Sequence, residues 1–118
     1  MKRIFSSIMV DALVIAPCTG NTLAKLAIGV TDTPVTMAAK AHLRCDRPLL
    51  IALATNDGLS ANLSNLNAMQ KRKSVYFVPL IQDDPEHKPH SIVCSFDKLT
   101  DSLYAALRGE QLRPLFLN

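Results

Sequence analysis

The chain has 118 residues and a formal net charge of +3, with 48% hydrophobic, 19% charged and 5% aromatic residues. This length suits one domain with a real hydrophobic core, and the composition excludes a disordered chain. The small net charge and the few aromatic residues argue against a nucleic-acid-binding surface, and no apolar run is long enough to span a membrane.

The first pattern, DALVIAPCTGNTLAKLAIGVTD, predicts a buried strand that leads through a polar turn into a helix. The strand covers residues 12–16, the turn residues 18–22 and the helix residues 22–28. Such a helix points its unpaired N–H groups at the space beyond the strand, where open α/β sheets bind ligands. An ordinary connection capped by Asn21 or Thr22 explains the same pattern, and both interpretations stay open.

Two further apolar runs and three helical patterns follow. The sequence next predicts a helix that starts at Pro34, with Asp32 or Thr33 as its cap, and then a strand over residues 49–54. A second helix with Leu59, Leu63, Leu66 and Met69 on one face leads to a strand over residues 75–80 and a short extended segment over residues 92–94. The last predicted helix covers residues 96–108 and buries Phe96, Leu99, Leu103 and Leu107.

This alternation predicts a three-layer, Rossmann-like α/β fold with a parallel sheet. The polar loops around Thr19, Asn56 and Asp83 then fall at the same edge of the sheet. At the first loop, Gly20 allows close backbone approach and Asn21 offers both a donor and an acceptor. This edge is therefore expected to hold an anionic or strongly polar ligand.

The run PCTGNTLAKLA resembles the Pro-Ala-Ser-Ala-Asn-Thr loop and following helix of the flavin-containing cysteine decarboxylase superfamily. The runs TDTPVTMAAKAHLR, TNDGLSAN and YFVPLIQDDPEHKPHSIV are more specifically similar to the flavoprotein (B) subunits of dipicolinate synthases. The resemblance covers a flavoprotein-like domain of residues 11–118, and residues 1–10 match poorly. The family begins with a further βα unit whose Thr-Gly-Ser turn holds the FMN phosphate, so the resemblance implies truncation at the N-terminus.

The resemblance also implies a function for the loops. It identifies Asn21 and Asn56 as catalytic candidates, and it places a flavin ring against Pro17, Cys18, Thr19, Gly20, Asn21 and Thr22. The implied cofactor is FMN, bound weakly because the phosphate-holding turn is missing. The implied enzyme is an oxidoreductase of sporulation, in which this flavoprotein and a dehydrogenase-like A subunit form dipicolinate from a dihydrodipicolinate precursor, a small dicarboxylate.

An oligomer built on trimers is expected, because a truncated domain leaves a sheet edge and an apolar face uncovered. A cofactor-free assembly domain of the same fold is the alternative to a flavin-binding subunit.

An FMN-dependent decarboxylase is disfavoured, because the segment before Asn56 lacks the Pro and Met of that branch and nothing near Cys94 reproduces its Ala-Cys-Gly lid. Residues 82–91 close over the site, dock on a partner or form a solvated acidic turn, and all three interpretations stay open.

The three cysteines, Cys18, Cys45 and Cys94, are widely spaced and show no metal-ligand pattern. They predict free thiols in a reducing, cytoplasmic compartment and no metal site.

Overall fold

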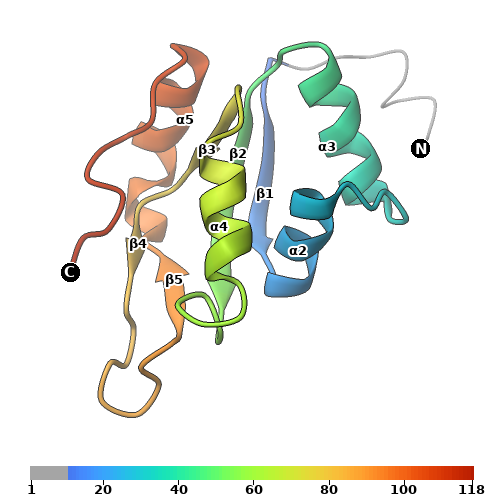
Figure 1. Cartoon of the computed structure of the whole chain (residues 1–118). Coiled ribbons are helices and arrows are strands. Elements are labelled where there is room, and N and C mark those ends of the chain that lie inside the picture. The colour runs from blue at the N-terminus through green and yellow to red at the C-terminus, as the bar shows by residue number, and fades with distance from the viewer. Residues whose placement is uncertain (1–10) are drawn as a thin grey trace.

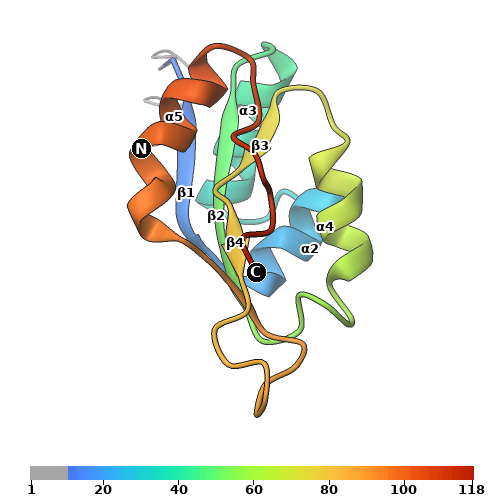
Figure 2. The same ribbon diagram turned by 90° about the vertical axis from the view of Figure 1, so that its left-hand side faces the viewer.

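The computed structural model describes residues 11–118, in which helices cover both faces of a five-stranded sheet (Figures 1 and 2). Residues 1–10, which were expected from the sequence to match the family poorly, lie outside the described residues. The elements are β1 (Leu13–Cys18), α2 (Gly20–Ile28), α3 (Pro34–Arg44), β2 (Leu49–Thr55), α4 (Leu63–Gln70), β3 (Val75–Phe77), β4 (Leu80–Ile81), β5 (Ile92–Cys94), a 3₁₀ turn (Phe96–Lys98) and α5 (Leu99–Leu107). None of the described helices has the length and apolar character needed to cross a bilayer.

The sheet combines parallel and antiparallel pairing. Leu49 of β2 lies opposite Leu13 of β1 and Val75 of β3, and both pairs of strands are parallel, as predicted. At the other end of β2, strand β5 pairs antiparallel with both β2 and β4. The predicted strand over residues 75–80 is two strands, β3 and β4, and Pro79 between them has no N–H to donate to a ladder.

Strand β2 forms the centre of the core. Its residues Leu49 to Leu53 are completely buried, because neighbouring strands pair with both edges and helices cover both faces. Figure 2 shows α5 on one side of the sheet and α2 and α4 on the other. This burial explains why the β2 sequence is a continuous apolar run rather than an alternating one.

The structure contains the predicted helices, but it changes where one of them begins and which residues of the last one are buried. The α3 helix begins with a capping box in which Thr33 and Thr36 bond reciprocally, one of the two caps that the sequence predicted. The α4 helix begins at Leu63, so Leu59 lies before it. The prediction that Phe96 and Leu107 are buried is wrong, since they are 51% and 45% exposed.

The fully buried residues of α5 are instead small, and Leu99 and Leu103 are partly buried against the core. Ser102, Ala105 and Ala106 are buried, which lets the helix backbone lie close to the sheet. The C-terminal tail then runs along the β4 edge, where Leu80 pairs with Phe116, and the Gln111 side chain bonds both backbone groups of Phe77 at 2.8 and 2.7 Å.

Candidate functional site

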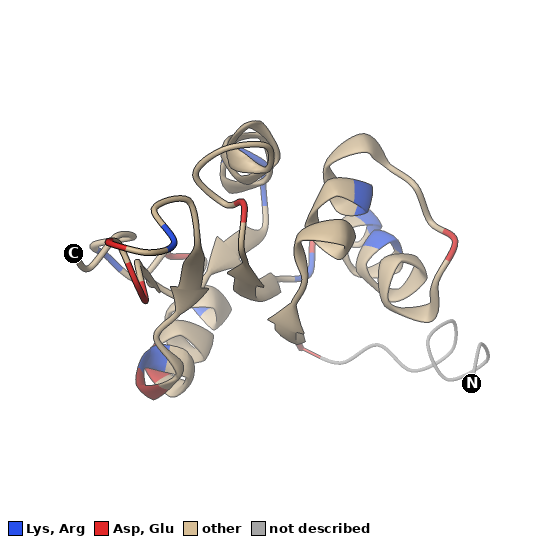
Figure 3. Cartoon of the chain, turned by 90° about the horizontal axis from the view of Figure 1, so that it is seen from below, with Lys and Arg blue, Asp and Glu red and all other residues tan. Residues whose placement is uncertain are grey.

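Three polar loops lie at one edge of the sheet, seen from below in Figure 3. The first two loops touch, because Gly20 packs against the side chains of Thr55 and Asn62. The second loop also meets the end of the third, where the Leu59 N–H donates to the His90 carbonyl at 3.0 Å. The edge at which the sequence places a polar ligand therefore consists of neighbouring segments.

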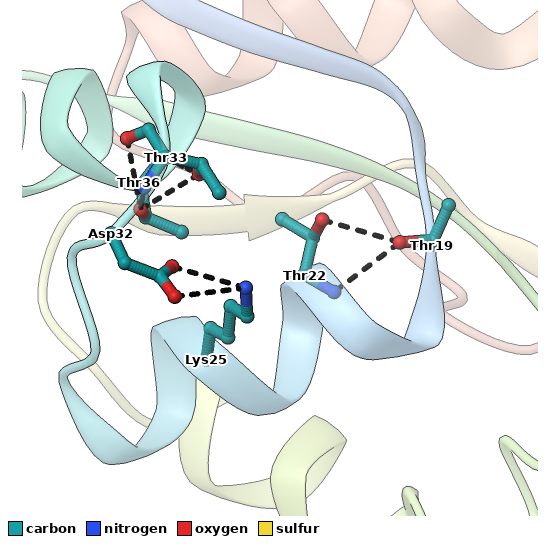
Figure 4. Close-up of polar contacts among 6 residues, drawn as sticks. All are labelled: Thr19, Thr22, Lys25, Asp32, Thr33 and Thr36. Carbon is teal, nitrogen blue, oxygen red and sulfur yellow. Dashed lines mark hydrogen bonds and ion pairs between the residues drawn. The ribbon is translucent and has the colours of Figure 1, made fainter.

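The turn before α2 is capped by Thr19, not by Asn21 or Thr22 as predicted. The Thr19 hydroxyl oxygen accepts from the Thr22 backbone N–H at 3.2 Å, and its O–H donates to the Thr22 hydroxyl at 3.2 Å (Figure 4). Asn21 is exposed, and its side chain has no hydrogen-bond partner among residues 11–118. The cap lies earlier in the turn than expected, which leaves the Asn21 amide available to a ligand at the N-terminus of the helix.

Two residues of the predicted flavin-binding turn face the protein itself. The Cys18 side chain is completely buried, and burial raises the pKa of its thiol to about 12, so only the backbone of Cys18 is available to a ligand. A side chain at Gly20 would collide with Thr55 and Asn62. Glycine is thus required there by the packing of the two loops.

A polar network that the sequence did not reveal supports this turn. Asp57 Oδ1 accepts from the Thr55 hydroxyl at 2.6 Å and from Asn62 Nδ2 at 2.9 Å, and Asn65 Nδ2 donates to Asn62 Oδ1 at 2.9 Å. The hydrogen bond from Asn62, followed by that from Thr55, lowers the pKa of Asp57 below its usual value. The predicted Asn56, by contrast, is exposed and has no side-chain hydrogen bond within the described part of the chain.

The free edge of β1 borders the same turn. Within the described residues, β1 pairs only with β2. A cleft of about 300 Å³ runs along this edge, and every residue that lines it is apolar: Leu13, Val14, Ile15, Ala16, Pro17, Pro34, Val35 and Ala38. The strand ends at Cys18, and the exposed Asn21 follows in the first turn of α2, so an apolar cleft and a free amide lie on consecutive segments, a combination that suits a flat ring system with a polar rim.

Residues 11–118 contain no cluster of three or more His, Cys, Asp or Glu side chains that could hold a metal ion. His42 is buried in α3, where Nδ1 lies 3.3 Å from the Ala38 carbonyl oxygen. This contact is typical of a packed structural histidine.

Comparison with known proteins identifies similar chains. A family model described as "Flavoprotein" matches residues 3–107. The dipicolinate synthase B subunit of Bacillus subtilis (strain 168) is 45% identical over 107 residues, which are 91% of this chain and 54% of that protein. A crystal structure of the dipicolinate synthase B subunit from Bacillus halodurans superimposes with a TM-score of 0.94 at 40% identity, covering 98% of this chain and 59% of the other.

The chain spans about half the length of the curated relative that it matches. A more distant structure, a PPC decarboxylase mutant complexed with pantothenoylaminoethenethiol, has a TM-score of 0.52 at 21% identity and covers 80% of this chain and 55% of the other. That likeness reflects the fold alone.

Proposed function

The chain belongs to the flavoprotein family, and on that premise we propose that it forms part of the flavoprotein (B) subunit of a cytoplasmic dipicolinate synthase. The observation that carries this proposal is the identity with the Bacillus subtilis protein, which extends over nearly the whole chain. Membership of the family implies a flavin cofactor, and the finer proposal is that this flavin is FMN.

The fit of a flavin to the described residues is good on two counts. The apolar cleft beside Val14 and Pro17 suits the ring, and the unpaired Asn21 amide suits its polar rim. A bound flavin supplies the electron-transfer chemistry of an oxidoreductase, which amino-acid side chains do not supply. Asn21 would orient the ring or a substrate carboxylate, and the network around Asp57 would hold the turn in place.

We further propose that a βα unit, on the same polypeptide or supplied separately, completes the flavin site. Its strand would pair with the free edge of β1, and its turn would hold the FMN phosphate. The unpaired edge and the apolar cleft beside it support this arrangement, because exposed apolar edge strands are usually covered. Charge-assisted bonds to phosphate contribute about 1.5–3 kcal/mol each, so the chain without two such bonds should bind FMN roughly two to four powers of ten more weakly.

The proposed reaction forms dipicolinate from a dihydrodipicolinate precursor during sporulation, with a dehydrogenase-like A subunit as partner. Within the described chain, Asn21 and Asn56 are the polar side chains best placed to meet the dicarboxylate substrate, since both are accessible and unpaired at one sheet edge. The proposed assembly is a homo-oligomer built on trimers.

Two measurements test this function. FMN titrated into the 118-residue chain should bind weakly, and adding the N-terminal βα unit of a related dipicolinate synthase flavoprotein should restore tight binding. The restored protein should then support dipicolinate formation, followed by absorbance, only together with an A subunit. Tight stoichiometric FMN binding to the chain alone would refute the phosphate proposal, whereas no flavin binding in either form would favour a cofactor-free assembly domain.

A further inference from the structure

A basic cleft lies away from the proposed flavin site, between α2, α3 and the turn that follows α4. Its volume is about 420 Å³, and four cationic side chains line it: Lys25, Lys40, Arg44 and Arg72. Lys25 is neutralised by Asp32, whose two carboxylate oxygens lie 3.0 and 3.2 Å from Lys25 Nζ (Figure 4). One of the four cations that line the cleft is therefore already paired with a carboxylate of the chain itself.

The other three cations have no carboxylate partner within residues 11–118. Lys40 and Arg44 lie one turn apart on α3 and are exposed, as is Arg72. Residues 1–10 contain no Asp or Glu, so they cannot supply a side-chain carboxylate. The cleft therefore carries three positive charges that no acidic side chain described in this chain neutralises.

The opposite charge gathers on the loop between β4 and β5, residues 82–91. This loop carries three acidic residues, Asp83, Asp84 and Glu86, against one lysine, Lys88, and both Figure 1 and Figure 2 show it projecting from the body of the molecule. Asp84 pairs with His87 at 3.1 Å, whereas Asp83 and Glu86 have no ion-pair partner among the described residues. The projecting loop thus presents unpaired carboxylates to its surroundings.

The loop and the cleft cannot meet within one chain, because the loop lies on the opposite side of the molecule from α2 and α3 (Figures 1 and 3), the helices that carry most of the residues lining the cleft. We propose that the loop of residues 82–91 of one copy docks in the basic cleft of a second copy. The contact joins two different surfaces, so the copies are arranged head-to-tail. Such an arrangement forms a closed ring when the rotation from one copy to the next divides a full turn evenly. The apolar floor of the cleft, Leu26, Val30 and Leu43, would receive the two prolines of the loop, Pro85 and Pro89.

Charge reversal on each side tests the docking. One variant carries Lys40→Glu and Arg44→Glu, a second carries Asp83→Lys and Glu86→Lys, and a third carries all four changes. Multi-angle light scattering at micromolar concentration measures the mass at low and at high salt. Each two-site variant should raise the dissociation constant of the oligomer at least tenfold, and the four-site variant should restore it, because the two charge patterns are then complementary again.

The matched control for the cleft variant is Lys73→Glu with Arg108→Glu, which makes the same change in net charge as Lys40→Glu with Arg44→Glu but outside the cleft, and should leave the mass unchanged. Circular dichroism confirms folding of every variant. A monomer at all salt concentrations, an oligomer insensitive to both reversals, or a four-site variant that stays dissociated would each overturn the proposal. Binding of inorganic pyrophosphate that Lys40→Glu with Arg44→Glu abolishes, with no change in mass, would overturn it in favour of a small-anion site.

Discussion

Asn62, directly before α4, donates a hydrogen bond to Asp57, in the loop after β2, over 2.9 Å between Nδ2 and Oδ1. The same amide packs on Gly20 at the start of α2. One buried side chain therefore links the second loop of the sheet edge to the first, and the position of the proposed flavin-binding turn depends on it.

Replacing Asn62 by alanine should destabilise the protein by about 1–2 kcal/mol, since the buried amide loses its bonds to Asp57 and Asn65. Urea unfolding followed by circular dichroism measures the change. Asn67→Ala is the matched control, because Asn67 is exposed and accepts one bond, from Gln70 at 3.1 Å. Its effect should stay within about 0.5 kcal/mol. Equal losses in the two variants would contradict a supporting role for Asn62.

The same network predicts how stability depends on pH. The hydrogen bonds from Asn62 and Thr55 hold the pKa of Asp57 below its usual value in the folded protein. The unfolded chain then binds the proton more readily, so the stabilisation is present above the ordinary carboxyl pKa of about 3.9 and is lost as the pH falls through the folded value. Unfolding free energies measured between about pH 5 and pH 2 should fall less steeply in Asn62→Ala than in the unmodified chain.

The elements that could be predicted from the sequence are those whose burial or capping produces a simple residue pattern. Strand β2 is a continuous apolar run because it is covered on both faces, and Pro34 with Thr33 marks the start of α3. The antiparallel addition of β5 was not predicted, because three residues carry little pattern and their pairing depends on contacts far along the chain. The exposure of Phe96 was missed for a related reason, since a 3₁₀ turn precedes α5 and changes the helical phase.

At the sheet edge, the sequence placed the loops but not the polar network between them. Asn62 is buried only because Gly20 lets the two loops touch, and that contact is tertiary. The signal available was an asparagine directly before an apolar helix, which more often marks an ordinary cap. The roles of Asn21 and Asn56 remain predictions.

Thiol labelling should distinguish the three cysteines of the native protein. Cys45 is exposed, whereas Cys18 and Cys94 are buried, and burial raises the pKa of both buried thiols. Because the thiolate is the reactive form, a disulfide reagent at about pH 8 should modify Cys45 rapidly and Cys18 only after unfolding. Cys45→Ser is the control and should abolish the fast phase. A persistent fast phase in that variant would show that the buried sites open readily.

Gly20→Ala should affect both stability and flavin affinity. The new methyl group meets the short side chains of Thr55 and Asn62, so we expect a loss of about 1–3 kcal/mol in unfolding free energy and a displaced turn. Gly29→Ala provides the comparison, because Gly29 adopts φ +82° with open space around it and should cost about 1 kcal/mol through backbone strain alone. Only Gly20→Ala should weaken flavin binding, as measured by flavin fluorescence titration. Similar weakening in both variants would indicate a general loss of folding.

Asn21→Ala tests the proposed flavin-binding turn with the least disturbance of the fold. The Asn21 side chain is exposed and bonds no other described residue, so the unfolding free energy of the flavin-free protein should change by no more than about 0.5 kcal/mol. Loss of one hydrogen bond to the flavin rim or to a substrate carboxylate should weaken binding or turnover about tenfold, which corresponds to about 1.4 kcal/mol. Asn67 on α4 is also exposed, and Asn67→Ala should leave both flavin binding and turnover unchanged. If Asn21→Ala also leaves flavin affinity and turnover unchanged once the N-terminal unit is supplied, the ring does not lie against this turn.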